Sequence, residues 1–281
     1  MPELPEVETV RRGLAPVMEG RKILRADANR PDLRFPLPAR FEDRLTGQTV
    51  MSLGRQAKFL TAALSSGEIL VMHLGMTGRF RIDAATPGSF VHATRDDPKH
   101  DHVVLHFEGG HVVTYNDPRR FGFMEFWPTV SFMDYPRLRD LGPEPLTNHF
   151  HAEYLSRALA GKDTPIKSAL LDQSVVAGLG NIYVCEALFR AGISPKRRAK
   201  SVTGARADRL ARAINAVIAD AIAAGGSSIS DFAGTDGALG YFQHQFDVYD
   251  RAGEHCRVCG QSVKRIVQSG RSTFHCGNCQ R

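Results

Sequence analysis

The feature that most constrains the fold is a set of four cysteines near the C-terminus. Cys256 and Cys259 form one Cys-x-x-Cys pair, and Cys276 and Cys279 form a second. Two pairs with this spacing bring four thiolates within tetrahedral reach of one zinc ion. Because four thiolates fill the coordination shell, no position is left for an activated water, and we predict one structural zinc. The residues between the pairs predict a β-hairpin whose tip carries Arg271.

Length and composition are those of a soluble multidomain protein. The 281 residues are enough for about two domains and a small appendage. No apolar run reaches the roughly 20 residues of a membrane span and no signal segment opens the chain, so we expect a cytoplasmic protein without a membrane partner. Paired cysteines in such a compartment indicate metal binding and not disulfides. The net charge of +6 favours an anionic partner, with nucleic acid as the first candidate.

The N-terminus has the character of a nucleophile. Removal of the initiator methionine would leave Pro2 with a free amine, which titrates at about pH 8 and is partly uncharged at neutral pH. Residues 3–13 predict a helix with Pro5 in its first turn, whose dipole disfavours a proton on that amine. Glu3 and Glu6 share one helix face near the amine and are candidate proton donors or acceptors. From these residues alone, an ordinary capped helix remains an alternative.

Hydrophobic patterning changes twice along the chain. From residue 21 to about 127, short apolar segments alternate with glycine turns, and Gly109-Gly110 predicts a hairpin between two of them. Apolar residues then recur every three or four positions. This spacing predicts helices at 153–159, 166–171, 182–191 and 206–224. Short strands return from about residue 245. We therefore predict an α+β multidomain chain with domains at 1–130, 131–240 and 245–281, the first an antiparallel β-sandwich.

A series of motifs runs in one order along the chain. They are PELPEVET at 2–9, AKFL at 57–60, HLGM at 73–76, HDHV at 100–103, DPRRFG at 117–122, LGPEPL at 141–146, GNIY at 180–183 and the two cysteine pairs. The series resembles bacterial formamidopyrimidine-DNA glycosylase over essentially the whole chain. The resemblance implies an N-terminal β-sandwich, a helix-two-turn-helix domain and a C-terminal four-cysteine zinc finger, which hold damaged double-stranded DNA between two lobes. It also implies a bacterial cytoplasmic monomer, associated with the nucleoid when it acts on DNA, without an obligate protein partner or an organic cofactor.

The same resemblance implies a bifunctional glycosylase and lyase. An oxidised purine, 8-oxoguanine or a formamidopyrimidine, is turned out of the duplex, and Pro2 attacks C1′ of its sugar. The base leaves, and a cationic imine then allows β- and δ-elimination to cleave the strand at the abasic site. Glu3 is implied as the proton donor and Glu6 as a support for the amine and the first helix. Lys58 is implied to assist β-elimination and Arg271 to assist δ-elimination.

Further residues are implied to contact DNA. Met76 and Phe121 would fill the stack that the extruded base leaves, and Arg119 would hydrogen-bond the orphaned cytosine. The other DNA contacts implied are His100, Lys162, Lys167 and Asn181.

Two other functions stay open at this point. An endonuclease VIII type glycosylase for oxidised pyrimidines shares the amine and the helical domain, but Leu4 and the set of Met76, Arg119 and Phe121 favour the purine enzyme. A non-enzymatic binder of damaged DNA would have no use for the reactive residues. For Lys58, whose apolar neighbours make an unpaired charge costly, the alternative is a side chain that extends to solvent.

Two segments depart from the family pattern. Ser230 stands where relatives often carry lysine or arginine, in the region implied to cover the extruded base, so its base-capping contacts are open. The loop at residues 87–97 is longer than the family predicts and has no assigned role.

Overall fold

The structure is a computed structural model that describes residues 2–83, 97–227 and 240–281. Contacts group the chain into two units, one of Met1–Arg139 with Gly225–Tyr241 and one of Asp140–Ala224 with Phe242–Arg281. Ser230 and nearly all of the 87–97 loop lie outside the described residues. None of the described helices combines the length and apolar character needed to cross a membrane. The three domain boundaries remain a prediction.

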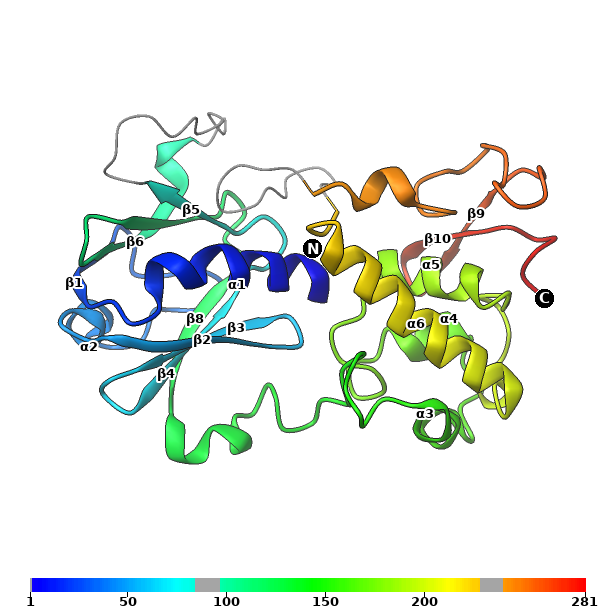
Figure 1. The fold of residues 1–281 in the computed structure, drawn as a ribbon, viewed down its shortest axis with the longest axis horizontal. Helices are drawn as coiled ribbons and strands as arrows, with labels where there is room; N and C mark the ends of the chain where they lie inside the picture. Colours follow the sequence, from blue (N-terminus) through cyan, green and yellow to red (C-terminus); the bar gives the residue numbers. More distant parts are fainter. Residues whose placement is uncertain (1, 84–96, 228–239) are drawn as a thin grey trace. The chain divides into compact units, whose positions relative to one another are not determined.

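The first unit is built on two four-stranded antiparallel sheets (Figure 1). One has the order β1 (Ile23–Ala28), β6 (Asp101–Phe107), β7 (Val112–Asn116) and β5 (Arg79–Asp83). The other has the order β2 (Val50–Gln56), β3 (Phe59–Leu64), β4 (Glu68–His73) and β8 (Phe123–Pro128). The predicted hairpin at Gly109-Gly110 joins β6 to β7. The antiparallel N-terminal fold is therefore confirmed.

Helix α1 (Leu4–Met18) packs on β2 and β3. Its buried residues Val7, Val10, Leu14 and Met18 recur at helical spacing and join the core formed by the strands. Burial of each such side chain contributes roughly 1.5–3 kcal/mol. The predicted helix at 3–13 was too short, because this apolar stripe continues beyond Gly13 and keeps the next turn on the core.

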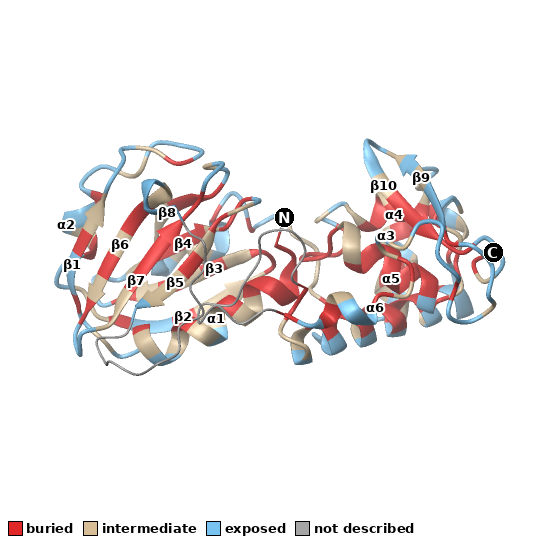
Figure 2. Cartoon of the chain, turned by 90° about the horizontal axis from the view of Figure 1, so that it is seen from above, coloured by how far each residue is buried: buried red, intermediate tan, exposed pale blue. Residues whose placement is uncertain are grey.

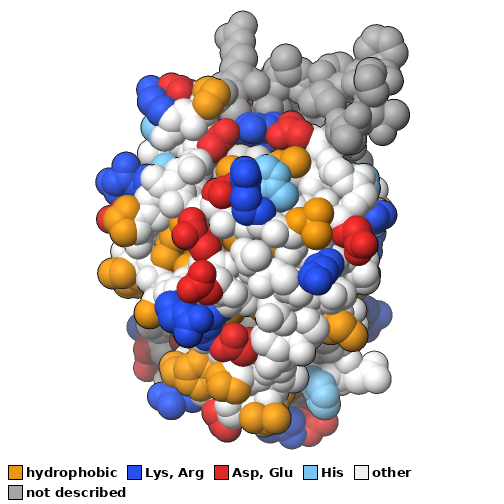
Figure 3. Space-filling view, turned by 90° about the vertical axis from the view of Figure 1, so that its left-hand side faces the viewer, with side chains coloured by type: hydrophobic (Ala, Val, Ile, Leu, Met, Phe, Trp, Pro, Cys, Tyr) orange, Lys and Arg blue, Asp and Glu red, His pale blue; other side chains and the backbone are white. Residues whose placement is uncertain are grey.

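Short helices complete the first unit. They are α2 (Phe41–Leu45), η1 (Pro98–His100) and η2 (Thr129–Asp134). Figure 2 shows that the buried residues follow the strands of both sheets, as expected for sheets that share a core. At the end of the unit near β1 and α2, Lys and Arg side chains are interspersed with Asp and Glu (Figure 3), so that face does not stand out as an anion-binding surface.

The second unit is mainly helical. Its helices are α3 (Ala152–Leu159), α4 (Ile166–Leu170), α5 (Asn181–Arg190), η3 (Ala199–Ser201), α6 (Ala205–Ala223) and η4 (Phe242–Gln245). Helix α6 packs against α3 and α5 through its apolar face. The four predicted helices are confirmed to within one residue at each end, since each has a clear three- and four-residue apolar repeat.

The turns between α4 and α5 are held by one side chain. The Gln173 amide donates to the carbonyls of Leu171 and Leu179 at 3.2 and 2.9 Å, and its oxygen accepts from Gly178 N–H at 3.0 Å. These bonds satisfy backbone groups that no helix uses. They set the start of α5, where Asn181 stands.

The C-terminal segment contains the predicted hairpin, formed by β9 (Lys264–Gln268) and β10 (Arg271–His275). Its two-residue turn has φ of 49° at Ser269 and 73° at Gly270, the backbone that a type I′ turn requires. Helix α5 supports the chain leading to this segment through Glu186, whose buried carboxylate accepts the N–H groups of residues 247, 248 and 249 at 2.8–3.0 Å. Burial raises the pKa of Glu186 despite these bonds.

Candidate active site

Pro2 and Glu3 lie at the buried start of α1. Glu3 is the N-cap residue, is 3% exposed, and is followed by Pro5 within the first turn of the helix. Pro2 is buried immediately before it. This is the local structure that the N-terminal motif predicts, because proline is tolerated in the first turn, where no helical hydrogen bond is lost. A catalytic role for either residue stays a prediction.

Glu6 is a buried acceptor for three donors. Its Oε2 accepts from Glu3 N–H at 2.9 Å, and its Oε1 accepts from the N–H and the hydroxyl of Ser227 at 2.8 and 2.9 Å. Gly226 fits beside it with φ of 76°, and a Cβ there would lie 3.1 Å from the carboxylate. Glu6 therefore joins the first turn of α1 to Ser227, the last described residue before 228–239. Sequence reasoning did not identify Ser227, since nothing local marks a serine as the partner of a distant carboxylate.

Lys58 lies in the two-residue turn between β2 and β3. Gln56 pairs with Phe59 across the hairpin, so Ala57 and Lys58 form the turn. Lys58 is only 7% exposed, which excludes a side chain that simply extends into solvent. The positive charge of Lys58 lowers the pKa of His73, a histidine on the neighbouring strand β4.

His73 is a half-buried, neutral ring at the end of β4. Its ring stacks on Phe123 at 5.2 Å with an interplanar angle of 11°, and its Nδ1 accepts from Gly75 N–H at 3.0 Å. Burial and, second, the positive charge of Lys58 lower its pKa to about 4. Nδ1 can accept this bond only when it carries no proton. The hydrogen bond, the burial and the charge of Lys58 therefore all favour the neutral ring. The HLGM motif contained this residue, but sequence reasoning assigned it no role.

Met76 and Phe121 belong to two turns that are joined by Asp117. One Asp117 oxygen accepts from the Thr77 hydroxyl at 2.6 Å, and the other accepts from Gly122 N–H at 2.9 Å. Gly75 lies so close to the second turn that a Cβ there would be 2.3 Å from the Phe121 backbone. Met76 and Phe121 are 42% and 41% exposed, so two large apolar side chains remain accessible beside these closely packed turns.

Arg119 and His100 contact the residues of these turns. The Arg119 guanidinium lies 4.6 Å from the centre of the Phe121 ring, a cation–π contact at the exposed end of the turn. The His100 carbonyl accepts from Asp117 N–H at 3.0 Å, so η1 is attached to the same structure. The structure thus brings together four predicted contact residues from separate motifs. Asp117, which organises them, carried no predicted role.

The remaining predicted residues lie in the second unit. Lys167 on α4 is fully buried, and Nζ donates to the Ser272 carbonyl and the Thr273 hydroxyl at 2.8 and 2.7 Å. Asn181 donates to the same Ser272 carbonyl at 3.0 Å. Both therefore hold strand β10 directly after Arg271, which is exposed. Lys162 lies half-buried between α3 and α4.

The four cysteines form one cluster suited to a metal. Their Sγ atoms lie within 4.8 Å of one another, with Cys256 and Cys279 separated by 3.9 Å and Cys259 and Cys276 by 3.5 Å. Four converging thiols fit a tetrahedral zinc ion, which would also stabilise their ionised forms together. Cys185 is buried in the apolar cluster beside them.

Comparison with known proteins identifies the same three parts. Residues 1–124 match the family model of the formamidopyrimidine-DNA glycosylase N-terminal domain, residues 141–233 match that of the H2TH domain of the same glycosylase, and residues 253–281 match that of a zinc finger found in FPG and IleRS. The described helices and the cysteine cluster agree with the last two assignments.

Relatives match over their full length. The chain is 58% identical to a formamidopyrimidine-DNA glycosylase of Ruegeria pomeroyi over 283 residues and 59% identical to one of Rhodopseudomonas palustris over 292, covering all of each chain. The Fpg protein of Thermus thermophilus has a similar structure, with a TM-score of 0.85 at 41% identity over 99% of this chain and 98% of that one. Lactococcus lactis Fpg, solved with abasic-site DNA, has a TM-score of 0.88 at 34% identity over 99% of both chains. The chain therefore belongs to the formamidopyrimidine-DNA glycosylase family.

Proposed function

We propose that this chain is a bifunctional DNA glycosylase and abasic-site lyase that removes 8-oxoguanine and formamidopyrimidines from duplex DNA. The observation that carries the proposal is the start of α1, where Pro2 and the buried Glu3 open the helix of a chain from this family. An amine and a carboxyl group in adjacent residues supply a nucleophile and a proton donor. Damaged DNA as the partner is supported by the relatives from Lactococcus lactis, which were solved with abasic-site and N7-benzyl-Fapy-dG DNA. The enzyme acts as a monomer without an obligate protein partner.

The chemistry starts at the sugar. The nitrogen of Pro2 forms a bond to C1′, the N-glycosidic bond breaks, and the base leaves with the electron pair and gains a proton. Glu3 donates a proton to the ring oxygen as the sugar opens to an iminium ion. Loss of the C2′ proton then breaks the bond to the 3′ oxygen, and loss of the C4′ proton breaks the bond to the 5′ oxygen. Water finally hydrolyses the imine and frees Pro2.

Lys58 and Arg271 assist the two eliminations, respectively. The burial of Lys58, whose charge acts on His73, supports a role for it inside the site and not on the outer surface. Arg271 is exposed directly after the two-residue hairpin turn, which suits a cation that binds phosphate. Glu6 supports the amine and the first turn of α1, since its oxygens accept three hydrogen bonds there.

The exposed turns fill the space left by the extruded base. Met76 and Phe121 enter the stack while Arg119 bonds the opposing cytosine, and their connection through Asp117 keeps them in register. His100, Lys162 and Asn181 contact the DNA. The zinc ion held by the four cysteines has a structural role, since a four-thiolate shell leaves no open coordination position.

Borohydride trapping tests the central step. A duplex in which 8-oxoguanine is paired with cytosine should give a covalent adduct with the processed chain. Pro2→Gly or retention of the initiator methionine should abolish this adduct. Arg12→Met, a change on an exposed side of α1, is the matched control and should trap normally. Peptide mapping of the sugar to a side chain other than Pro2 would refute the proposal.

Substrate panels separate the alternatives. An endonuclease VIII type enzyme would prefer oxidised pyrimidines, whereas the exposed pair of Met76 and Phe121 beside Arg119 favours the purine enzyme. A non-enzymatic binder would retain affinity for lesions but give no adduct. Affinity should also fall steeply with added salt, because several phosphates are neutralised.

A further inference from the structure

The turn that carries Lys58 has a strained backbone. Ala57 has φ of 51°, a left-handed conformation that its Cβ disfavours. Such residues persist where the surrounding structure holds them, and they occur often at functional sites. Ala57 is also buried, so the turn cannot relax toward solvent.

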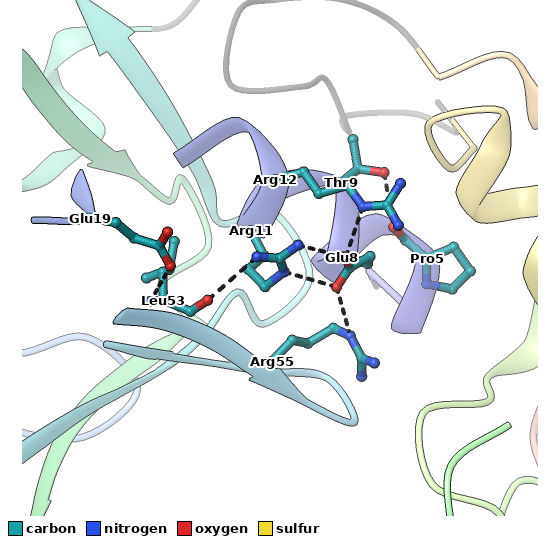
Figure 4. Close-up of polar contacts among 8 residues, drawn as sticks. All are labelled: Pro5, Glu8, Thr9, Arg11, Arg12, Glu19, Leu53 and Arg55. Carbon is teal, nitrogen blue, oxygen red and sulfur yellow. Dashed lines mark hydrogen bonds and ion pairs between the residues drawn. The ribbon is translucent and has the colours of Figure 1, made fainter. Parts of the chain in front are cut away.

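Arg55, near the end of β2, is bonded both to this turn and to α1. Its Nη1 donates to the Ala57 carbonyl at 2.9 Å. Its Nε donates to Oε2 of Glu8 on α1 at 3.3 Å, the contact drawn in Figure 4. The side chains of Arg55 and Glu8 are only 15% and 13% exposed. The guanidinium meets the two acceptors from two separate nitrogens, Nη1 and Nε, in a rigid planar fork that the single nitrogen of a lysine does not reproduce.

Glu8 is itself fixed in place. Arg11 donates to both of its oxygens at 3.1 and 2.9 Å, and Arg12 donates at 2.8 Å. Burial opposes ionisation of Glu8, but these bonds and the charge of Arg55 outweigh it and lower the pKa of Glu8. The carboxylate therefore remains charged at neutral pH and offers Arg55 a rigid anchor.

We propose that Arg55 is a positioning residue for Lys58. It connects α1, the helix that follows Pro2 and Glu3, to the turn that presents Lys58, so that the amine and the lysine keep one fixed geometry toward the same sugar. The inference rests on the proposed function, in which both groups act on one abasic site. Arg55 acts through the Ala57 carbonyl and need not touch DNA.

The test is single-turnover cleavage of a duplex with a preformed abasic site. Arg55→Met should slow strand cleavage at least about tenfold, since small displacements of a catalytic group cause losses of this order. It should leave the yield of the borohydride adduct near that of the wild type. Arg12→Met is the matched control, because it removes a bond to Glu8 but none to the Ala57 carbonyl, and it should cleave within about twofold of the wild type.

Two further variants separate positioning from charge and from folding. Arg55→Lys keeps the charge but not the two-acceptor fork, so its strand cleavage should be slowed as much as that of Arg55→Met. Cleavage by Arg55→Lys at the wild-type rate would overturn the proposal. In a Lys58→Ala background, Arg55→Met should have no further effect, and an equal slowing there would also overturn it. Thermal unfolding shows whether each variant is folded. If Arg55→Met does not fold, the cleavage rate of Arg55→Lys tests the positioning role.

The outcomes for the wild type and for Arg55→Met distinguish the proposed function from the positioning role of Arg55. If the wild type gives neither adduct nor cleavage, the proposed function is wrong. If it gives both and Arg55→Met cleaves like Arg12→Met, only the positioning role is wrong.

Discussion

The ammonium of Lys167 donates to the Ser272 carbonyl at 2.8 Å and so attaches helix α4 to strand β10. A fully buried lysine is costly unless its donors find acceptors, and here the Thr273 hydroxyl supplies another. The bond falls one residue after Arg271, at the start of the strand. Direct DNA contact by Lys167 remains a prediction, while the described contacts favour a support for Arg271.

Replacing Lys167 with methionine tests this support. Lys167→Met should lower the free energy of unfolding by about 1–3 kcal/mol, because the Thr273 hydroxyl loses a buried donor. Urea denaturation measures this, with the half-buried Lys162→Met as the control. Unchanged stability together with weaker DNA binding would instead indicate that Lys167 contacts DNA directly.

Replacing Glu6 with glutamine should be unusually harmful for so small a change. The amide presents a donor where the carboxylate accepts, and it will face either Glu3 N–H or Ser227 N–H. We expect a loss of about 1–3 kcal/mol in the free energy of unfolding, measured by denaturant titration. Glu19→Gln is the matched control, since Glu19 accepts one described bond, from Leu53 N–H, and the amide oxygen can retain it. Equal losses in the two variants would argue against this account of Glu6.

His73 should make stability depend on pH in a defined window. Its pKa is lowered from 6.5 to about 4, first by burial and then by the charge of Lys58. Between these values the unfolded chain binds a proton that the folded chain does not, so stability is fully present above about pH 6.5 and is lost as the pH falls toward 4. The difference corresponds to a few kcal/mol, of the order of 1.4 per pKa unit. His73→Gln should remove this part of the dependence in denaturation curves measured at pH 4.5 and pH 7, and an unchanged slope would contradict the assignment.

Metal removal should unfold the C-terminal segment. We expect one zinc per chain by elemental analysis, and chelation should abolish DNA binding because the hairpin carrying Arg271 loses its anchor. Cys276→Ser should behave like the chelated protein. Cys185→Ser is the control, since Cys185 is buried beside the cluster but is not one of its four thiols, and it should retain zinc. DNA binding that survives proven loss of zinc would refute this prediction.

Most elements of the fold were predictable because they depend on local periodicity. The apolar repeats of α3, α5 and α6 predicted their limits to within one residue, and Gly109-Gly110 predicted the turn between β6 and β7. Helix α1 was predicted too short because Gly13 is a weak helix former, whereas burial of Leu14 and Met18 against the sheet keeps the helix intact. In that helix, tertiary packing outweighed local propensity.

The candidate site was only partly predictable for the same reason. The motifs contained His73 and Asp117, but their functions as an acceptor for Gly75 N–H and as the link between two turns emerge only when the chain is folded. Arg55 and Ser227 gave no local signal at all.

The sequence by itself determined the kinds of element, the family and the four cysteines that cluster, because residue type, spacing and periodicity are properties of short stretches of chain. Only the tertiary structure decided which partner each buried polar group has. Glu6 and Ser227 are 221 residues apart, Lys167 and Ser272 are 105 apart, and Glu8 and Arg55 are 47 apart. A buried donor or acceptor must be satisfied by whatever group the packing brings to it, and that group is set by the whole fold and not by its neighbours in sequence.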